Sequence, residues 1–565
     1  MSQQQAPKSR EETIREDVTD LHHLGYAQEL FRTMGGFSNF AISFTIISIL
    51  TGAVILFDYG LAWGGPAAST IGWPLVSLFT LLIAASMAEI ASAYPTAGGL
   101  YYWSSRLKNK DWGWWTAWFN LAGQVAIVAG IDFAAAAFVN TSIVTPILSN
   151  FGVAFGNATV VLGPSSAPWL NGQLLTMAIL LVIQMFLNIA GVRVLAFLND
   201  ASVWWHIGTV AVIVVALFLV HNGKPLSTLN PFAFAPQDTQ GSASLFGGQI
   251  SLGSAAGYAI PIAFLFSLLQ AQWTFTGYDA SAHVAEETVG ARLSSAWGVF
   301  ISVAVSAVVG YIVLFALVTH LPPMELIFGS AQGGVCPPTA QYCSQYYLGN
   351  YPVVWSTLDY SLGALGDVLS AAIAIAMSLC GLASIAAASR MLFAFSRDKG
   401  APMSGWLRHV SIRFRTPANS IIGIVAVSFA ITVVAFIFGG STAIVIVTAI
   451  STIALYWAYG VPILLGLGGD QSWREHRVWS LGRFSRPVAM IAVLWIAFIS
   501  VLFLWPTSGN PYTLLAYLAF LVFLVVYYFV WARRRFKGPI VEVGEAELTE
   551  IEREFETAAE RLAGA

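Results

Sequence analysis

Roughly twelve stretches of about 20 residues in this chain carry few charges or none, and this pattern leaves few folds open. They are centred near residues 52, 82, 128, 182, 212, 270, 308, 378, 428, 453, 495 and 522. A helix of this length crosses the apolar core of a bilayer and satisfies its own backbone groups there. Hydrophobic residues make up 57% of the 565 positions and charged residues only 10%. The sequence therefore predicts an all-α integral membrane protein with about twelve transmembrane helices.

Two of these apolar stretches, residues 42–61 and 261–280, are interrupted by the same dipeptide, Thr51-Gly52 and Thr276-Gly277. Unwound backbone within a membrane is tolerated where it lines a cavity, and paired interruptions in two halves are typical of transporters. Spans one to five and six to ten are equal in number and begin on opposite sides. We therefore expect a five-plus-five inverted repeat with broken helices 1 and 6, followed by two extra helices.

Positive charges indicate the orientation. With both termini in the cytoplasm, all but one of the 26 Lys and Arg residues fall in inner segments, and only Lys224 lies outside. The predicted organisation is a cytoplasmic N-terminal tail (1–36), a transmembrane transporter domain (37–532) and a cytoplasmic acidic C-terminal tail (533–565). Within the domain, the repeats cover about 37–222 and 255–467 and the extra helices about 487–532. This organisation is that of a multi-pass plasma-membrane protein.

Two broken helices that cross at the midplane would present free N–H groups at one pair of ends and free C=O groups at the other. Such ends suit a zwitterion, whose carboxylate would accept from N–H groups and whose amino group would donate to carbonyls. The N–H donors would be Thr51, Gly52 and Ala53, and the carbonyl acceptors Ser48, Ile49, Trp273, Thr274 and Phe275. The alternative is that each glycine only permits close helix packing.

Several longer motifs resemble the amino acid-polyamine-organocation superfamily, and within it the amino acid/choline branch that includes GABA permeases. The matching segments are FSNFAISF (37–44), AEIASAYPTAGGLYYW (88–103), FTGYDASAHVAEET (275–288) and SRMLFAFSRD (389–398). The resemblance implies the same inverted-repeat fold and an aromatic gate at Trp273 and Phe275, with Tyr278 and Asp279 beginning the inner half of helix 6. Relatives carry a small-residue triplet in helix 1, whereas this chain keeps only Gly52, so the resemblance does not set the size of the substrate.

The coupling residue is the main departure from these relatives, several of which have a Lys in helix 5. This chain has none there, and His206 is the first candidate because histidine titrates near neutral pH. Alternatively, a neutral His206 bonds a nearby carbonyl. Glu89 is the second candidate, against a structural pairing with a base such as Arg106. A sodium site would instead use a helix 8 hydroxyl, for which Ser384 is available.

Other polar residues leave further alternatives. Asp279 could contact a substrate ammonium or a coupling cation, or could cap the helix that follows it. Glu286 and Glu287 would join Arg292 in an inner salt-bridge network. Cys336 and Cys343 lie in a predicted outward loop and could form a local disulfide.

The sequence contains no metal-ligand spacing, no phosphate-binding loop and no nucleophile-base set, so no metal, cofactor or enzymatic activity is expected. The sequence also has no basic face that would indicate binding to nucleic acid. We predict a permease that imports a small amino acid or GABA-like compound by alternating access, with H⁺ as coupling ion and the lipid bilayer as its surroundings. The alternatives are a choline, other quaternary-amine or polyamine permease, and a sodium-coupled amino acid transporter.

Overall fold

The computed structural model describes residues 9–155, 160–162, 165–167, 171–224, 226–227, 229–234, 242–245, 248–251, 259–323, 353–439, 443–468, 471–505, 512–539 and 548–553. Within these residues, eleven helices are long and apolar enough to cross a membrane, and a shorter apolar helix covers Ile260–Thr274. Together they account for the twelve predicted stretches and confirm the all-α membrane fold. Cys336 and Cys343 lie outside the described residues, so their disulfide stays a prediction.

The first five membrane segments run from α2 to α10, and the first of them is broken into three pieces. Asn109 and Asn171 cap the third and fourth segments, because their side chains accept hydrogen bonds from the first helical N–H groups. The elements are α1 (Arg10–His23), α2 (Gly36–Ile47), α3 (Gly52–Ile55), α4 (Phe57–Gly64), η1 (Ala68–Gly72), α5 (Trp73–Ala93), α6 (Leu100–Leu107), α7 (Lys110–Val139), η2 (Asn140–Val144), α8 (Thr145–Ser149), α9 (Gly172–Ile189), α10 (Val192–Leu219) and η3 (His221–Gly223).

The next five segments begin with a second broken helix. Its pieces are α11 (Ile260–Ser267), α12 (Leu269–Thr274), α13 (Ala280–His283) and η5 (Ala285–Glu287). The others are α14 (Ala291–Thr319), α17 (Val353–Leu362), α18 (Ala364–Arg397), α19 (Ser404–Leu407), α20 (Ala418–Gly439) and α21 (Ala443–Leu467).

The last segments are α22 (Trp473–His476), η7 (Gly482–Phe484), α23 (Ser485–Leu504), α24 (Tyr512–Tyr527), η8 (Tyr528–Ala532) and α25 (Arg533–Arg535). Short antiparallel strands lie in two of the connections between membrane segments. They are β1 (Ala154–Phe155), β2 (Val160–Leu162) and β3 (Ser165–Ala167) before α9, and β4 (Ser242–Leu245) and β5 (Gly248–Ser251) before α11.

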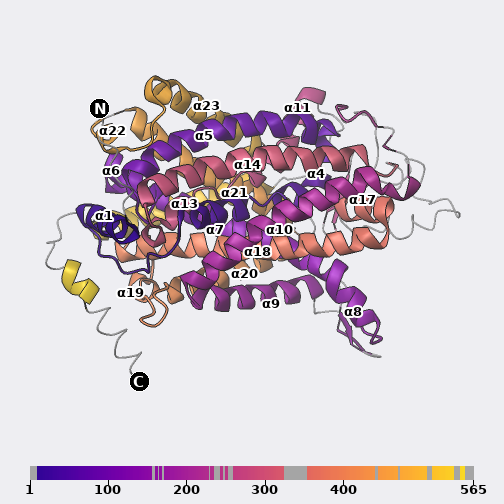
Figure 1. Cartoon of the computed structure of the whole chain (residues 1–565), viewed down its shortest axis with the longest axis horizontal. Coiled ribbons are helices and arrows are strands. Elements are labelled where there is room, and N and C mark those ends of the chain that lie inside the picture. Colours follow the sequence, from indigo (N-terminus) through magenta and orange to yellow (C-terminus); the bar gives the residue numbers. More distant parts are fainter. Residues whose placement is uncertain are drawn as a thin grey trace.

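The long helices lie side by side along the longest axis of the molecule, with α1 and α22 at one end and α8 and α17 at the other (Figure 1). Helix α7 contacts α21, α18, α9 and α20 and is largely buried. Peripheral helices show the opposite pattern. On α9, Ile179, Ile183 and Phe186 recur at helical spacing on one exposed face, as expected of a helix that faces lipid.

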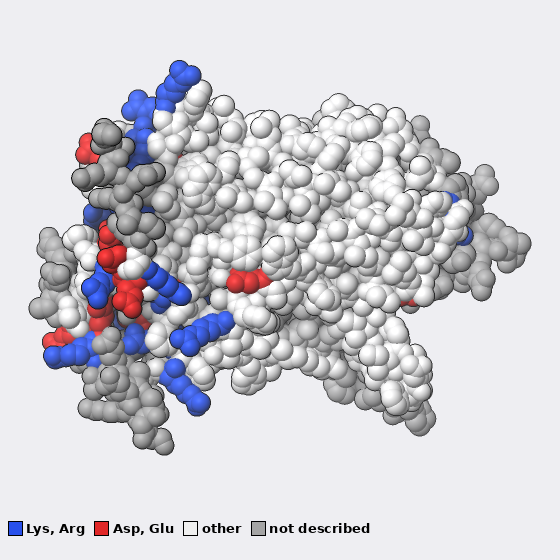
Figure 2. All heavy atoms as spheres, in the orientation of Figure 1, with Lys and Arg blue, Asp and Glu red and all other residues white. Residues whose placement is uncertain are grey.

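Charged side chains gather at the end of the molecule that carries α1, whereas the middle of the face shown in Figure 2 is almost free of charge. Helix α1 is fixed there by Asp17, whose carboxylate accepts from the N–H groups of Gly290 (2.7 Å) and Ala291 (3.1 Å) at the start of α14. Burial raises the pKa of Asp17, while nearby Arg32 acts to lower it. The charged end is thus ordered by specific contacts.

Main-chain bonds also join the start of the first broken helix to the end of the second. The N–H groups of Thr33 and Met34 donate to the Glu287 carbonyl (3.0 and 2.9 Å), and the Val289 N–H donates to the Met34 carbonyl (2.9 Å). We call this set of three bonds the inner clasp. It links two segments that are about 250 residues apart in the chain.

Candidate functional site

The first broken helix unwinds at Ser48, which follows α2 with a left-handed backbone (φ 32°). The Ser48 carbonyl accepts from the N–H groups of Thr51 (2.7 Å) and Gly52 (3.0 Å), and α3 begins at Gly52. Two of the three N–H groups predicted to bind a carboxylate are thus occupied by the chain itself in this conformation. A substrate carboxylate would have to replace the Ser48 carbonyl as their acceptor.

The second broken helix unwinds after Thr274, and α13 begins again at Ala280. Gly277 has φ +83°, a conformation that favours glycine. Its N–H donates to the Tyr459 hydroxyl on α21 (3.0 Å), while the Thr276 hydroxyl donates to the Trp273 carbonyl (2.6 Å). The break is therefore held by hydrogen bonds to α21 and within the turn.

The two breaks touch each other, and each depends on a glycine. A Cβ on Gly52 would lie 2.7 Å from the backbone Cα of Thr274, and one on Gly277 would lie 2.3 Å from the Ile46 side chain. Real Cβ atoms do not approach other atoms this closely. The glycine of each Thr-Gly pair therefore allows the two broken helices to lie in direct contact, because a larger residue would clash. The sequence left two interpretations of these glycines open, namely close helix packing and a cavity. Both features occur here together.

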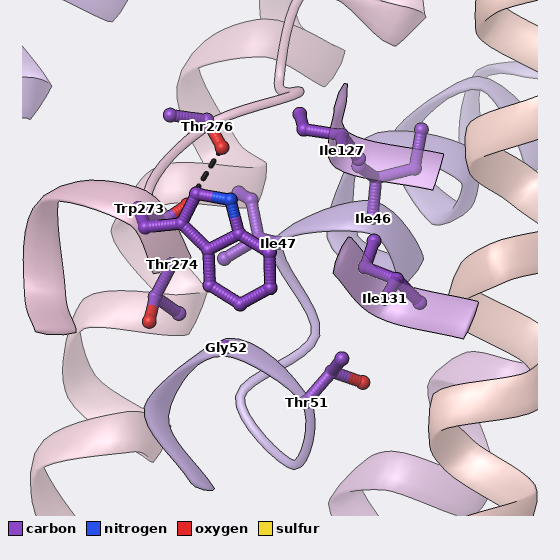
Figure 3. Close-up of a pocket in the computed structure, with 9 residues that line it drawn as sticks. All are labelled: Ile46, Ile47, Thr51, Gly52, Ile127, Ile131, Trp273, Thr274 and Thr276. Atoms are coloured by element: carbon purple, nitrogen blue, oxygen red, sulfur yellow. Dashed lines mark hydrogen bonds between the residues drawn. The ribbon is translucent and has the colours of Figure 1, made fainter. Parts of the chain in front are cut away.

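A small cavity lies between the breaks, with a volume of about 10 Å³, which is room for about one water molecule. Figure 3 shows the Trp273 indole facing it, with Thr274 on one side and isoleucines of α2 and α7 on the other. The lining residues are Ile46, Ile47, Thr51, Gly52, Ile127, Ile131, Trp273, Thr274 and Thr276. No amino acid fits in this volume, so the conformation is closed and must expand around a substrate.

The predicted binding residues divide into two groups. Thr51, Gly52, Trp273, Thr274 and Thr276 line the cavity. The remaining ones are buried near it without lining it, namely Ser48, Ile49, Ala53, Phe275, Gly277, Tyr278 and Asp279.

The aromatic residues of helix 6 point in different directions. The Phe275 ring packs on Trp73 of α5, with ring centroids 4.6 Å apart, and the Tyr278 ring packs on Tyr459, with centroids 4.9 Å apart. Only Trp273 faces the cavity. Its indole Nε1 is buried and has no hydrogen-bond partner among the described residues. This N–H is the one orphaned side-chain donor on the described cavity wall.

His206 on α10 bridges to the first break. Its Nε2 lies 2.7 Å from the Ser48 hydroxyl, and its Nδ1 lies 2.8 Å from the Ser202 carbonyl. Because a carbonyl only accepts, Nδ1 carries a proton, and Nε2 can accept from Ser48. A neutral ring satisfies both contacts, and no carboxylate among the described residues forms an ion pair with it. From the sequence, the alternative to a coupling role was a neutral His206 that bonds a nearby carbonyl. The bonds in this structure are of that kind, and Ser202 supplies the carbonyl.

Asp279 lies at the centre of a buried polar cluster below the second break. Its Oδ1 accepts from the Tyr459 hydroxyl (2.8 Å), and its Oδ2 accepts from the amides of Asn120 (2.9 Å) and Gln124 (3.1 Å). His283 Nε2 is 3.0 Å from the same Oδ2. The Asp279 side chain makes no capping bond to α13. The carboxylate is thus engaged by α7, by α21 and by His283 of the helix that it precedes.

The remaining candidates lie away from the cavity lining. Glu89 pairs with Arg477 (2.7 Å) and accepts from the Ser485 hydroxyl, so its base is Arg477 in place of Arg106. The Ser384 hydroxyl donates to the Cys380 carbonyl one turn earlier on α18 (2.8 Å).

The inner salt-bridge network contains Glu286 and Glu287 as expected, but their partners are arginines other than Arg292. Glu286 pairs with Arg397 (2.9 Å) and Glu287 with Arg390 (3.2 Å), whereas Arg292 contacts Asp20 at 4.0 Å. The Glu287–Arg390 pair is fully buried.

Several site residues were not identified from the sequence, among them Ile46 and Ile47 at the end of α2. Ile127 and Ile131 stand one turn apart on α7 and form the apolar cavity wall, but an isoleucine pair in a transmembrane helix gives no distinguishing signal. His283 was part of the motif FTGYDASAHVAEET, and its position four residues after Asp279 could have indicated a same-face pair.

Comparisons with known proteins show similarity to permeases along most of the chain. The family model described as amino acid permease matches residues 34–530. Amino-acid permease BAT1 of Arabidopsis thaliana is 32% identical over 537 residues, which cover 93% of this chain and 96% of that protein. The amino-acid permease BAT1 homolog of Oryza sativa subsp. japonica is also 32% identical, over 93% of this chain and 95% of its own. A putative polyamine transporter of Candida albicans is 24% identical, over 95% of this chain and 93% of its own.

Proposed function

The chain belongs to the amino acid permease family, and on that premise we propose that it imports a small amino acid or GABA-like compound across the plasma membrane by proton-coupled alternating access. The observation that carries the proposal is the closed cavity between two broken helices at Gly52 and Thr274. Backbone groups freed at such breaks bind charged ends of a substrate. Opening of the cavity to one side and then the other would move the substrate across.

The chemistry of the cavity wall favours an amino acid over a polyamine. None of its nine lining residues is charged. A polyamine placed there would lose its hydration without gaining a carboxylate partner, which costs several kcal/mol per charge by order of magnitude. A zwitterion needs no net countercharge and can use the Trp273 N–H and the backbone at both breaks. The similarity to a putative polyamine transporter keeps polyamines as the competing substrate.

A quaternary-amine substrate has less support. A cation-π cage requires several aromatic faces around one point. Trp273 faces the cavity, but Phe275 packs on Trp73 and Tyr278 packs on Tyr459. The three aromatic residues of the break therefore do not share one cage in this conformation.

The orientation follows from the charge distribution. Lys and Arg residues concentrate at the end that carries α1 (Figure 2), and the cytoplasmic side of a membrane protein is enriched in these residues. We therefore assign that end, and with it both termini, to the cytoplasm.

Uptake into proteoliposomes tests the proposal. Labelled GABA and labelled amino acids are offered under an inward proton gradient, with and without sodium, with unlabelled amino acids, choline and spermidine as competitors. We expect accumulation that follows the proton gradient and is blocked by amino acids. Accumulation that requires sodium would overturn the coupling, and competition by spermidine or choline alone would overturn the substrate class.

Trp273→Phe is expected to weaken substrate binding while the cavity keeps its aromatic wall. The substitution removes the orphaned Nε1–H, and a hydrogen bond to a charged group is worth about 1.5–3 kcal/mol. The KM for uptake should rise by roughly ten- to a hundredfold. Initial rates over a concentration series measure this effect, and Trp205→Phe on the exposed face of α10 is the matched control. An unchanged KM would show that the indole N–H does not contact the substrate.

A further inference from the structure

Asp279 and His283 form a buried polar pair below the second break. Both side chains are fully buried, and His283 Nε2 lies 3.0 Å from Asp279 Oδ2. On the other side of the ring, His283 Nδ1 lies 3.1 Å from the backbone carbonyl of Ala97. Both ring nitrogens of His283 therefore face acceptor oxygens.

Counting hydrogens gives the protonation of this pair. The Ala97 carbonyl can only accept, so Nδ1 of His283 carries a proton. The Nε2–Oδ2 contact then needs a second proton, either on the ring or on the carboxyl. Without it, a nitrogen lone pair would face a carboxylate oxygen at hydrogen-bond distance. The observed geometry thus requires one proton more than a neutral imidazole and an ionised carboxylate hold together.

The other partners of Asp279 favour placing this proton on the ring. Asn120, Gln124 and Tyr459 each provide a hydrogen to the carboxyl group. Together with His283 they make four donors, which suits an ionised carboxylate with two acceptor oxygens. His283 is then an imidazolium.

The pair is connected to the substrate cavity through one hydroxyl. Tyr459 donates to Asp279 Oδ1 and accepts from the Gly277 N–H within the second break. Gly277 follows Thr276, which lines the cavity. A change of charge at Asp279 therefore acts on the hydrogen bond that holds the break.

In the other direction, the pair is connected to the charged end of the molecule. The Ala97 carbonyl contacts His283, and the Ala97 N–H donates to Glu286 Oε1 (3.0 Å). Glu286 pairs with Arg397, whose side chain is 12% exposed. Ala97 thus ties the pair to Glu286 and to a partly exposed arginine, although its C=O and N–H belong to different peptide groups and pass no proton between them.

Few other charged groups act on the pair. Helix α2, which packs against α13, contains none. From α14 the only charged residue is Arg292, which bonds the Ser92 carbonyl.

Helix α18 contributes Arg390 and Arg397, which are already paired with Glu287 and Glu286. It also contains Asp367, which lies in its first turn. From α7, the groups that contact Asp279 are the neutral amides of Asn120 and Gln124. The titratable groups of α21 are Tyr459 and Tyr456, whose ring centroids lie 6.1 Å apart. The Tyr278 ring packs against Tyr459.

We propose that Asp279 and His283 together form the proton-binding site that couples transport, and that the closed conformation is the proton-loaded one. This inference rests on the proposed function. Loss of the proton to water that reaches the pair from the charged end leaves two lone pairs facing each other and separates α13 from its partners. The same movement releases Tyr459 from the break and opens the cavity. His206, satisfied as a neutral ring, has no part in this step.

A spectroscopic test does not depend on transport. The protein contains eight histidines, and ¹⁵N-histidine labelling in nanodiscs distinguishes imidazolium from neutral rings. The signal missing from His283→Gln identifies His283. We expect it to be imidazolium at a pH where His206 is neutral, or neutral with a carboxylic acid band that Asp279→Asn removes. A neutral His283 without such a band would overturn the proposal.

The transport test uses the same variants in proteoliposomes. We expect His283→Gln to lose accumulation driven by the proton gradient while it retains exchange of labelled GABA or amino acid for unlabelled substrate. His320→Gln is the control, because His320 is buried and bonds the Ala316 carbonyl without a carboxylate partner. Asp279→Asn/His283→Gln replaces the pair by two neutral amides and substitutes for the single variant if that does not fold.

The outcomes separate this proposal from the proposed function. Proton-driven accumulation that survives in His283→Gln, or that is lost only in His206→Gln, would overturn the assignment to the pair. A wild-type protein that moves no amino acid, or moves it only with sodium, would overturn the proposed function, while the spectroscopic result still decides the protonation of the pair.

Discussion

Gly52→Ala should abolish transport although the protein still folds and inserts. The new Cβ would lie 2.7 Å from the Thr274 Cα, 2.6 Å from its Oγ1 and 2.8 Å from its Cβ. Because one of these atoms belongs to the backbone, the two breaks must move apart. Overpacking of this kind costs about 1–3 kcal/mol, a modest loss for a large membrane protein. The closed state around the substrate is therefore lost before the fold is. Uptake of labelled substrate, measured beside the amount of protein in the membrane, checks this result.

Two further variants make this test specific. Gly208→Ala places a methyl group on the lipid-facing side of α10, where nothing lies within 4 Å, and should transport normally. Thr274→Ala in the Gly52→Ala background removes the Oγ1 contact but leaves the Cα, so it should not restore activity. Normal uptake by Gly52→Ala would mean that the two breaks do not need to touch during transport.

The largest loss of stability is expected from Arg390→Met. Arg390 and Glu287 are both fully buried, and their nitrogen and oxygen atoms lie 3.2 Å apart. Removing one partner leaves an uncompensated buried charge, which costs about 3–5 kcal/mol. Thermal unfolding of the purified protein in detergent should therefore begin at a clearly lower temperature than in the wild type.

A double variant distinguishes the lost pair from lost packing. Glu287→Gln/Arg390→Met leaves no unpaired charge and should be more stable than Arg390→Met alone. Arg534→Met at an exposed position of α25 should leave the unfolding temperature unchanged. A double variant that is less stable than the single one would show that the charge of Glu287 is not what destabilises Arg390→Met.

The helices were predictable because lipid imposes their length and composition. Every predicted stretch corresponds to an observed apolar helix, and both interrupted stretches contain a break near the expected dipeptide. The break in helix 6 extends over Phe275–Asp279, beyond the Thr-Gly pair, because Tyr459 on a distant helix bonds the Gly277 N–H. A contact of this kind leaves no local pattern in the sequence.

The site was predictable only in part, because many of its contacts join residues that are far apart in the sequence. Local turn chemistry indicated Thr51, Gly52 and Thr276. The partners of Asp279 come from α7 and α21, and those of Glu286 and Glu287 come from α18. These pairs are separated by more than 100 residues, so their register depends on tertiary packing. Nearby Arg292 was a reasonable expectation from sequence distance alone.

The inner clasp has a mechanical consequence. Its bonds run between main-chain atoms of Thr33, Met34, Glu287 and Val289, so proline, which lacks the N–H, is the substitution that removes one of them directly. The two broken helices are fastened to each other at the clasp and again where Gly52 meets Thr274. Two fastenings at different depths hold the pair together in the closed conformation, so the contact between the breaks must yield before the cavity can expand while the clasp keeps the inner ends joined. Gly65 and Gly290, both with positive φ, stand where the pair joins its neighbours at η1 and α14, so the backbone can bend there most easily if the pair tilts.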